Sequence, residues 1–158
     1  MNPDIKAKWL EDLRSGNFRQ GRAVLHRVTR DDNGKIVHEF CCLGVLCEQA
    51  VAAGVVERTF VGDASGTGHY RYHAPGVDGA CYGDANYLPR VVAEWAGLDT
   101  HSPGVVDPHS FGGSVSLADL NDSWRHDFNT LATMIENSPS VGLHPDTPED
   151  DTDDWIMA

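Results

Sequence analysis

The sequence predicts an α+β fold, in which a small antiparallel sheet packs against a central helix and several further helices. Three observations lead to this prediction. Two β-type runs flank an Asn-Gly turn and predict a hairpin over residues 22–40. An apolar stripe at helical spacing follows at once over 42–53. Later segments combine the same spacing with helix-capping residues. The length of 158 residues fits one domain.

The first element is predicted to be an amphipathic helix over residues 3–15. Pro3 suits its first turn and Gly16 suits its end. Its apolar side chains recur at helical spacing, and we expect them to face the core: Ile5, Trp9, Leu10 and Leu13.

The hairpin and the central helix carry the strongest local signals. Strands are expected over 22–29 and 35–40, with the turn at 32–35. The helix over 42–53 ends before Gly54, a residue suited to a left-handed cap. Its buried stripe is expected to contain Leu43, Leu46, Cys47, Ala50 and Val51.

Residues 61–87 differ in character, because glycines alternate there with tyrosine and histidine. This composition fits short strands joined by loops, and it also fits a mobile flap. The sequence leaves both open.

Three further helices are predicted in the second half of the chain. One begins at Leu88-Pro89 and stops at Gly97. The next begins at Ser116, where Asp119 completes a capping box. The last runs from Asp127 to residue 137 or 138.

The globular domain is expected to span residues 1–143, followed by an acidic tail over 144–158. The stretch 144–154 contains six acidic residues, two prolines and no basic residue. This composition predicts disorder, because too little apolar surface is present to offset the entropy of ordering.

Composition excludes several classes of function. The net charge of −12 argues against direct binding of nucleic acid, which requires basic residues to displace phosphate counterions. No apolar run approaches the roughly 20 residues of a membrane span, and the first residues lack the apolar stretch of a secretion signal. We therefore expect a cytoplasmic protein, either a monomer or a homodimer. The four cysteines lack the spacing of a metal site, so we expect no metal and no cofactor.

Three motifs follow one another in the chain: Phe-Cys-Cys-Leu-Gly-Val-Leu-Cys at 40–47, Leu-Pro with Val-Ala-Glu-Trp-Ala-Gly-Leu at 88–98, and Ser-Leu-Ala-Asp-Leu-Asn-Asp at 116–122. In these motifs the chain resembles a family of small uncharacterised proteins encoded by tailed bacteriophages, including those of actinobacteria, and by prophages. The resemblance covers most of residues 1–138. It implies a phage or prophage origin and an accessory role in the cytoplasm of a bacterial host cell, and it brings no catalytic assignment.

One hypothesis places a ligand site at the hairpin. Eight of the twelve basic residues precede residue 36, so the hairpin is basic although the whole chain is acidic. Arginines beside a helix N-terminus suit an anion, and nearby tyrosines could stack on a base. The candidate ligand-binding residues are Arg22, His26, Arg27, Arg30, Cys42 and Tyr72. A small nucleotide-like ligand would fit this set.

A second hypothesis is a cysteine-dependent hydrolase or transferase. Cys41 and Cys42 stand where a strand meets a helix, and a helix N-terminus lowers the pKa of a thiol. A histidine would act as the base, with His73 and His109 as candidates.

Three functions therefore remain open. The first is an accessory protein that acts by binding a host protein or a nucleotide-like defence signal. The second is the cysteine enzyme. The third is a DNA mimic whose carboxylates imitate phosphates. Binding is preferred because no complete set of catalytic residues is visible in the sequence.

Overall fold

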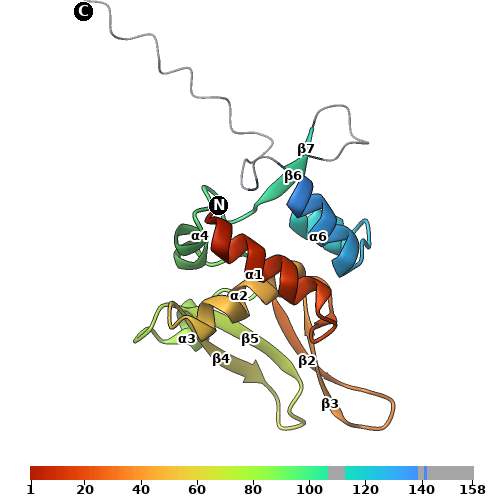
Figure 1. Cartoon of the computed structure of the whole chain (residues 1–158). Helices are drawn as coiled ribbons and strands as arrows, with labels where there is room; N and C mark the ends of the chain where they lie inside the picture. The colour runs from red at the N-terminus through yellow and green to blue at the C-terminus, as the bar shows by residue number, and fades with distance from the viewer. Residues whose placement is uncertain (107–112, 139–140, 142–158) are drawn as a thin grey trace, which may run out of the picture.

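The computed structural model describes residues 1–106, 113–138 and 141. Within these ranges the chain forms six helices, a five-stranded sheet and a two-stranded sheet, so the predicted α+β class is confirmed. The helices gather on one side of the molecule, and the hairpins of the larger sheet project away from them (Figure 1).

The first helix, α1 (Pro3–Arg14), begins as predicted. The side chain of Asn2 caps it by accepting hydrogen bonds from the backbone N–H groups of Asp4 and Ile5. Trp9 is fully buried, and its Nε1 donates to the carbonyl oxygen of Cys42 over 2.9 Å. This bond fixes α1 against the central helix.

The larger sheet has the strand order β1-β3-β2-β5-β4. All neighbours are antiparallel except β1, which runs parallel to β3. The predicted hairpin forms, but its first strand starts at residue 26 rather than 22. Ala23 has a φ of +68°, a left-handed conformation that interrupts the extended chain. The strands are β1 (Arg19–Gln20), β2 (His26–Arg30), β3 (Ile36–Phe40), β4 (Glu57–Gly62) and β5 (Gly68–His73).

The glycine-rich stretch forms the second hairpin, β4 and β5, and the short helix α3 (Gly79–Tyr82). In the strand pairing between β2 and β5, only two residue pairs connect this hairpin to the first, Arg27 with His69 and Val28 with Gly68. Closer to the helices the two hairpins separate, and residues 84–85 lie between them. Asp84 exchanges two backbone hydrogen bonds with Tyr72, and the carbonyl of Ala85 accepts one from Leu25.

The central helix α2 (Cys42–Ala52) is buried along most of its length. It lies so close to the start of β2 that a side chain at Gly44 would overlap the carbonyl oxygen of Leu25. The same carbonyl accepts a hydrogen bond from the N–H of Cys41 over 3.2 Å. Gly54 follows the helix with a φ of +74°, in the left-handed conformation expected for it.

The remaining helices agree with the capping signals in the sequence. The last residue of α4 (Arg90–Ala96) is followed by Gly97 with a φ of +71°. At the start of α5 (Leu117–Asp122), the hydroxyl of Ser116 accepts from the N–H of Asp119. Asp127 caps α6 (Phe128–Asn137) in the same way. The two-stranded sheet consists of β6 (Gly104–Val106) and β7 (Ser114–Ser116).

The predicted acidic tail over 144–158 lies outside the described residues. In the part of the chain that is described, none of the helices is both long enough and apolar enough to cross a lipid bilayer.

The close contact at Gly44 gives a direct test of the core. We expect Gly44→Ala to lower the free energy of unfolding by about 3 kcal/mol, because the backbone on both sides of the contact is held by hydrogen bonds and overpacking costs about 1–3 kcal/mol. Denaturant unfolding measures this change. Ala52→Ser, on the exposed side of the same helix, is the control and should cost less than about 1 kcal/mol. A loss below about 0.5 kcal/mol in Gly44→Ala would contradict the tight packing.

Candidate functional site

The larger sheet presents two faces of different chemistry. Directly paired residues of antiparallel strands share a face, so the register assigns each side chain. We call the side that contacts α2 the helix-side face, and it carries His26, Val28, Arg30, Ile36, His38, Phe40, Arg58, Phe60, Tyr70 and Tyr72. The opposite side, the far face, carries Arg27, Thr29, Val37, Glu39, Glu57, Thr59, Val61, His69, Arg71 and His73.

A chain of hydrogen bonds runs across the helix-side face. It starts at Glu48 of α2, whose carboxylate binds the guanidinium of Arg58 through Oε2. The hydroxyl of Tyr72 donates to Glu48 Oε1 over 2.7 Å. His26 Nδ1 lies 3.2 Å from the same hydroxyl, and His26 Nε2 lies 2.8 Å from Nδ1 of His38.

The order of donors in this chain follows from its first member. A carboxylate accepts only, so the proton of the Tyr72 hydroxyl points at Glu48. The hydroxyl oxygen then accepts from Nδ1–H of His26, which leaves Nε2 of His26 as an acceptor for Nδ1–H of His38. The chain therefore fixes which ring nitrogen of His26 donates and which accepts, and it ends at Nδ1–H of His38.

Aromatic rings enclose the middle of this chain. His26 is 1% exposed, and its ring centroid lies 4.1 Å from that of Phe40 and 4.4 Å from that of Tyr70, which is stacked on it. The guanidinium carbon of Arg58 lies 5.1 Å from the Tyr70 ring centroid, a cation–π contact. The side chains around His26 are thus closely packed without a bound ligand.

The electrostatics of the site keep its charges fixed at neutral pH. Burial of the Glu48 carboxyl raises its pKa, but the donors His26, Arg58 and Tyr72 outweigh burial and hold that pKa at about 2. Burial lowers the pKa of His26, against the opposite effect of Glu48. Burial and the Glu48 charge raise the pKa of the Tyr72 hydroxyl. Glu48 is therefore ionised, His26 is neutral and Tyr72 remains a donor.

Beyond the reach of α2, the helix-side face is open. We call this part the open patch, and it consists of Ile36, His38, Phe60 and Tyr70. Ile36 is 36% exposed and Phe60 is 39% exposed, which is high for apolar side chains on a sheet. Arg30 borders the patch, where its guanidinium donates to the carbonyls of Gly34 and Ser65.

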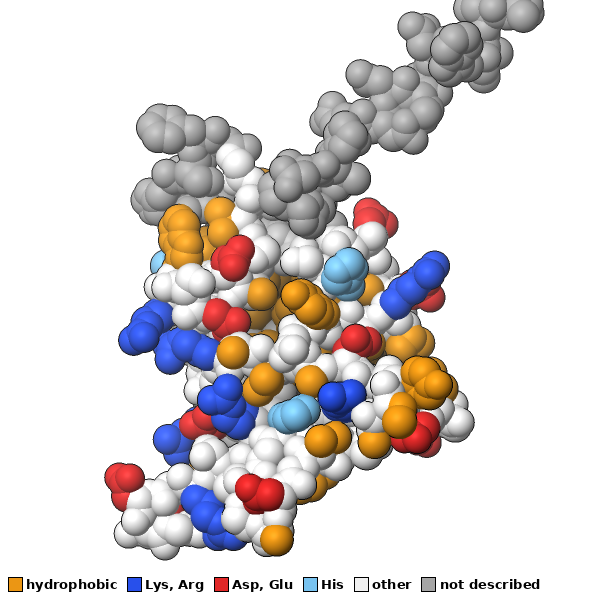
Figure 2. Space-filling view, turned by 180° about the vertical axis from the view of Figure 1, so that it is seen from behind, with side chains coloured by type: hydrophobic (Ala, Val, Ile, Leu, Met, Phe, Trp, Pro, Cys, Tyr) orange, Lys and Arg blue, Asp and Glu red, His pale blue; other side chains and the backbone are white. Residues whose placement is uncertain are grey.

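The far face contains a hollow of about 300 Å³ in which opposite charges balance. Arg19 lies 3.4 Å from Glu39 in an ion pair across the parallel strands. The hollow is lined by Arg19, Arg27, Arg30, Thr29, Val37, Asp31, Asp32 and Glu39. Arg19 and Arg27 thus share the hollow with Asp31, Asp32 and Glu39, so the hollow offers little net positive charge to an anion. Basic and acidic side chains are also interspersed over the described surface seen in Figure 2.

The predicted ligand-binding residues do not form one cup. His26 and Tyr72 do meet, on the helix-side face. Arg27 lies on the far face, where it donates to the carbonyl oxygen of Arg22 over 3.5 Å, so the sheet separates it from the tyrosines. Cys42 is fully buried in the core and has no access to a ligand at the surface.

Cys41, Cys42 and Cys47 are packed in the core, whereas Cys81 is exposed. Burial raises the pKa of Cys41 to about 11 and raises that of Cys42 well above its ordinary value, whereas a nucleophile requires a lowered pKa. The Sγ of Cys42 lies 3.7 Å from the carbonyl oxygen of Leu117, to which it donates. His73 uses both ring nitrogens locally, at Thr59 Oγ1 over 2.8 Å and at the carbonyl of Ala74 over 2.9 Å. The second candidate base, at position 109, lies outside the described residues.

Sequence reasoning missed three members of the hydrogen-bonded chain, His38, Glu48 and Arg58. Only His38 had a usable signal. The predicted Asn-Gly turn fixes which residues of the hairpin lie opposite one another, and this register places His38 on the face of His26. Among the described residues, no three His, Cys, Asp or Glu side chains converge to hold a metal ion.

Comparison with known proteins gives a family but no activity. Residues 1–139 match the model of a family described as a domain of unknown function, DUF8296. No curated protein and no solved structure matches the chain. The function must therefore be inferred from the geometry of this chain alone.

The hydrogen-bonded chain makes stability depend on pH. The folded pKa of His26 is below its ordinary value of 6.5, so acidification protonates the unfolded state first and stability falls as pH drops below about 7. Glu48 adds a second loss between pH 4.5 and about 2, where the unfolded carboxyl takes up a proton before the folded one. Thermal unfolding between pH 8 and pH 3 measures both losses.

The histidine contribution can be isolated with His26→Phe, which keeps a ring between Phe40 and Tyr70 but removes the titrating group. We expect this variant to lose the dependence between pH 7 and pH 5, whereas His101→Gln, at an exposed histidine, should retain it. Identical profiles for His26→Phe and the unchanged protein would place the acid sensitivity elsewhere.

The thiols give a second prediction. In the native protein at pH 8, iodoacetamide should label Cys81 alone, because the other three cysteines are buried. The reaction should be slow, since a hydrogen bond and the negative charge of Asp78 raise the pKa of Cys81. Mass spectrometry counts the labels, and Cys81→Ser is the control that should take up none. Rapid labelling of Cys41 or Cys42 near neutral pH would instead support the cysteine enzyme.

Proposed function

We propose that this chain, which belongs to the DUF8296 family of domains of unknown function, acts by binding a protein partner through the open patch. The observation that supports this proposal is that the large side chains of the open patch are held in place by residues of the hydrogen-bonded chain beneath them. His38 is held by His26, and Tyr70 is held by its stacking on His26 and by Arg58. A surface fixed before binding loses little entropy when a partner docks.

The composition of the open patch suits a protein partner. Aromatic rings are typical of the energetically dominant centre of protein interfaces, and Phe60 and Tyr70 supply them here. Arg30 borders the patch and adds a positive charge to its rim, whereas the charge of Arg58 is balanced by Glu48. The complementary partner would combine an apolar centre with surrounding carboxylates.

A nucleotide-like ligand has less support. It would need a cationic grip on the phosphates and a ring platform for the base within one site. The arginine of the far face, Arg27, is separated by the sheet from Tyr70, and carboxylates share its hollow. We therefore propose that the accessory role consists in binding a protein rather than a nucleotide-like ligand. We place this role in the cytoplasm of a bacterial host, as the proposed phage origin implies.

Site-specific crosslinking tests the proposed surface. A photoreactive phenylalanine analogue is placed at Phe60 in one protein and at Val77 in another, because both positions are 39% exposed but only Phe60 belongs to the open patch. After irradiation in actinobacterial cells, we expect a discrete covalent adduct from position 60 and none from position 77. Ile36→Lys should abolish the adduct, since it places a charge in the patch without disturbing the core. Equal crosslinking from both positions, or none from position 60, would contradict the proposal.

The nucleotide alternative has its own test. We expect cyclic and linear nucleotides to leave the thermal midpoint unchanged, because Arg27 lies on the face opposite Tyr70, Arg58 is bound by Glu48, and Arg30 donates to backbone carbonyls. A ligand at 100 times its dissociation constant would add about 2.7 kcal/mol to the stability, which a thermal shift detects readily. A shift that Arg27→Ala abolishes would favour the nucleotide and would argue against the protein partner.

A further inference from the structure

A second concave site lies beside α4. Its volume is about 660 Å³, within the range of pockets that hold small ligands. It is lined by Asp84, Tyr87, Leu88, Arg90, Ala93, Glu94, Leu98, Asp99, Thr100 and His101. None of these residues belongs to the open patch or to the hydrogen-bonded chain described above.

The floor of this cavity is apolar and rigid. Leu88, Ala93 and Leu98 belong to the buried core and are each no more than 5% exposed. Gly97, in the left-handed conformation, and the hydrogen bond from Leu98 N–H to the carbonyl of Ala93 fix the end of α4 above this floor. A ligand with an apolar body could therefore rest on a preformed surface.

The wall of the cavity is aromatic. Tyr87 is 63% exposed, although tyrosine rings usually bury most of their surface. Its ring meets that of His101 edge to face, with the centroids 6.1 Å apart. The face of Tyr87 is electron-rich and favours a planar or cationic group beside it.

The charges around the cavity are predominantly negative. Arg90 is the only arginine or lysine in the lining, and its Nε donates to Glu94 over 2.7 Å, so these two charges neutralise one another. Asp84 and Asp99 remain as carboxylates without such a partner in the lining. Burial raises the pKa of Asp84, while the nearby His101 acts in the opposite direction.

Asp84 is also firmly positioned. Its backbone exchanges hydrogen bonds of 2.8 Å with Tyr72 of β5, in both directions. The backbone of Asp84 is therefore anchored to the sheet, whereas Asp99 belongs to the loop after α4. Both acidic residues are exposed and line the apolar, aromatic recess from separate segments.

From this combination we infer that the cavity binds a small organic cation with a planar or apolar body, such as an aryl amidine, a guanidinium compound or an amine. The cationic group pairs with Asp84 and Asp99, and the body lies between Tyr87 and the floor of Leu88 and Leu98. Amidinium and guanidinium groups can bind a carboxylate through two hydrogen bonds, which gives both strength and orientation.

Three probes of one shape test the inference: benzamidine is cationic, benzamide is neutral and benzoate is anionic. Amide chemical shifts in two-dimensional NMR spectra of the full chain would be followed at increasing concentration of each. We expect saturable shifts with benzamidine only, concentrated at residues 84–101. Asp99→Asn and Asp84→Asn should each weaken the binding about tenfold or more, the usual cost of losing a charged hydrogen bond.

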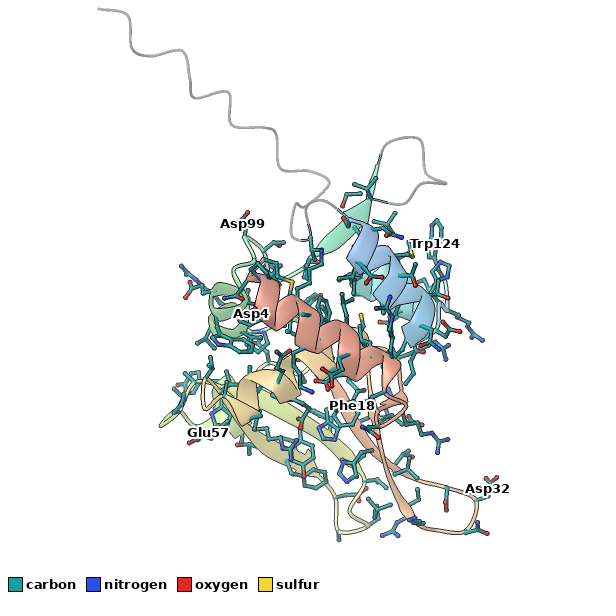
Figure 3. All side chains as sticks on the ribbon, in the orientation of Figure 1. Asp4, Phe18, Asp32, Glu57, Asp99 and Trp124 are labelled. Atoms are coloured by element: carbon teal, nitrogen blue, oxygen red, sulfur yellow. The ribbon has the colours of Figure 1, made fainter. Side chains whose placement is uncertain are left out.

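Glu57→Gln is the matched control, because it removes one exposed carboxylate and lies well away from Asp99 (Figure 3). Its affinity for benzamidine should be unchanged, which separates the cavity from general attraction to an acidic protein. Equal binding of benzamide would overturn the inference, since charge would then play no part. Preferential binding of benzoate, or the absence of saturable shifts with benzamidine at 10 mM, would overturn it as well.

Discussion

The rest of the structure depends on the close approach of α2 to the start of β2. The carbonyl of Leu25 accepts from Cys41 and lies against Gly44, so helix and strand meet through their backbones. Trp9 fixes α1 to the same turn of α2 through the carbonyl of Cys42. This contact sets the height of the helix above the sheet, and thereby allows Glu48, farther along α2, to reach the sheet and receive the hydroxyl of Tyr72. The geometry of the site is a consequence of how the core is packed.

The three sequence motifs at 40–47, 88–98 and 116–122 have structural roles. The cysteine motif forms the buried face of α2, and the motif at 88–98 forms α4 and its glycine cap. In the third motif, Asn121 is fully buried and joins α5 to the chain before β2, where it donates to the carbonyl of Gly21 and accepts from Gln20. Similarity in these segments therefore reports a shared core. The open patch and half of the residues that line the cavity lie outside them, and at these positions members of one family can differ in what they bind.

The elements with local signals were predictable from sequence, and the arrangement between them was not. The Asn-Gly turn, the cap at Ser116 and the glycine after α4 each act within a few residues, so the chain displays them directly. The second hairpin was left open because its glycines weaken the alternation that marks a strand. The prediction that Arg27 and Tyr72 share a site failed for a different reason: adjacent positions of a strand point to opposite faces, and which face the tyrosine hairpin would join depends on a pairing between distant strands.

The narrow junction between the two hairpins bears on how the protein reaches its native state. Within each hairpin the paired residues are close in sequence, and such pairs form early because closing a short loop costs little entropy. Joining the hairpins brings together Val28 and Gly68, which are forty positions apart, with only one further pair to reward it. The chain before β2 must at the same time meet Ala85 and Asn121. We therefore expect the slow step of folding to be the association of the two formed hairpins around α2. The packing of this helix would then limit the rate at which the whole chain folds.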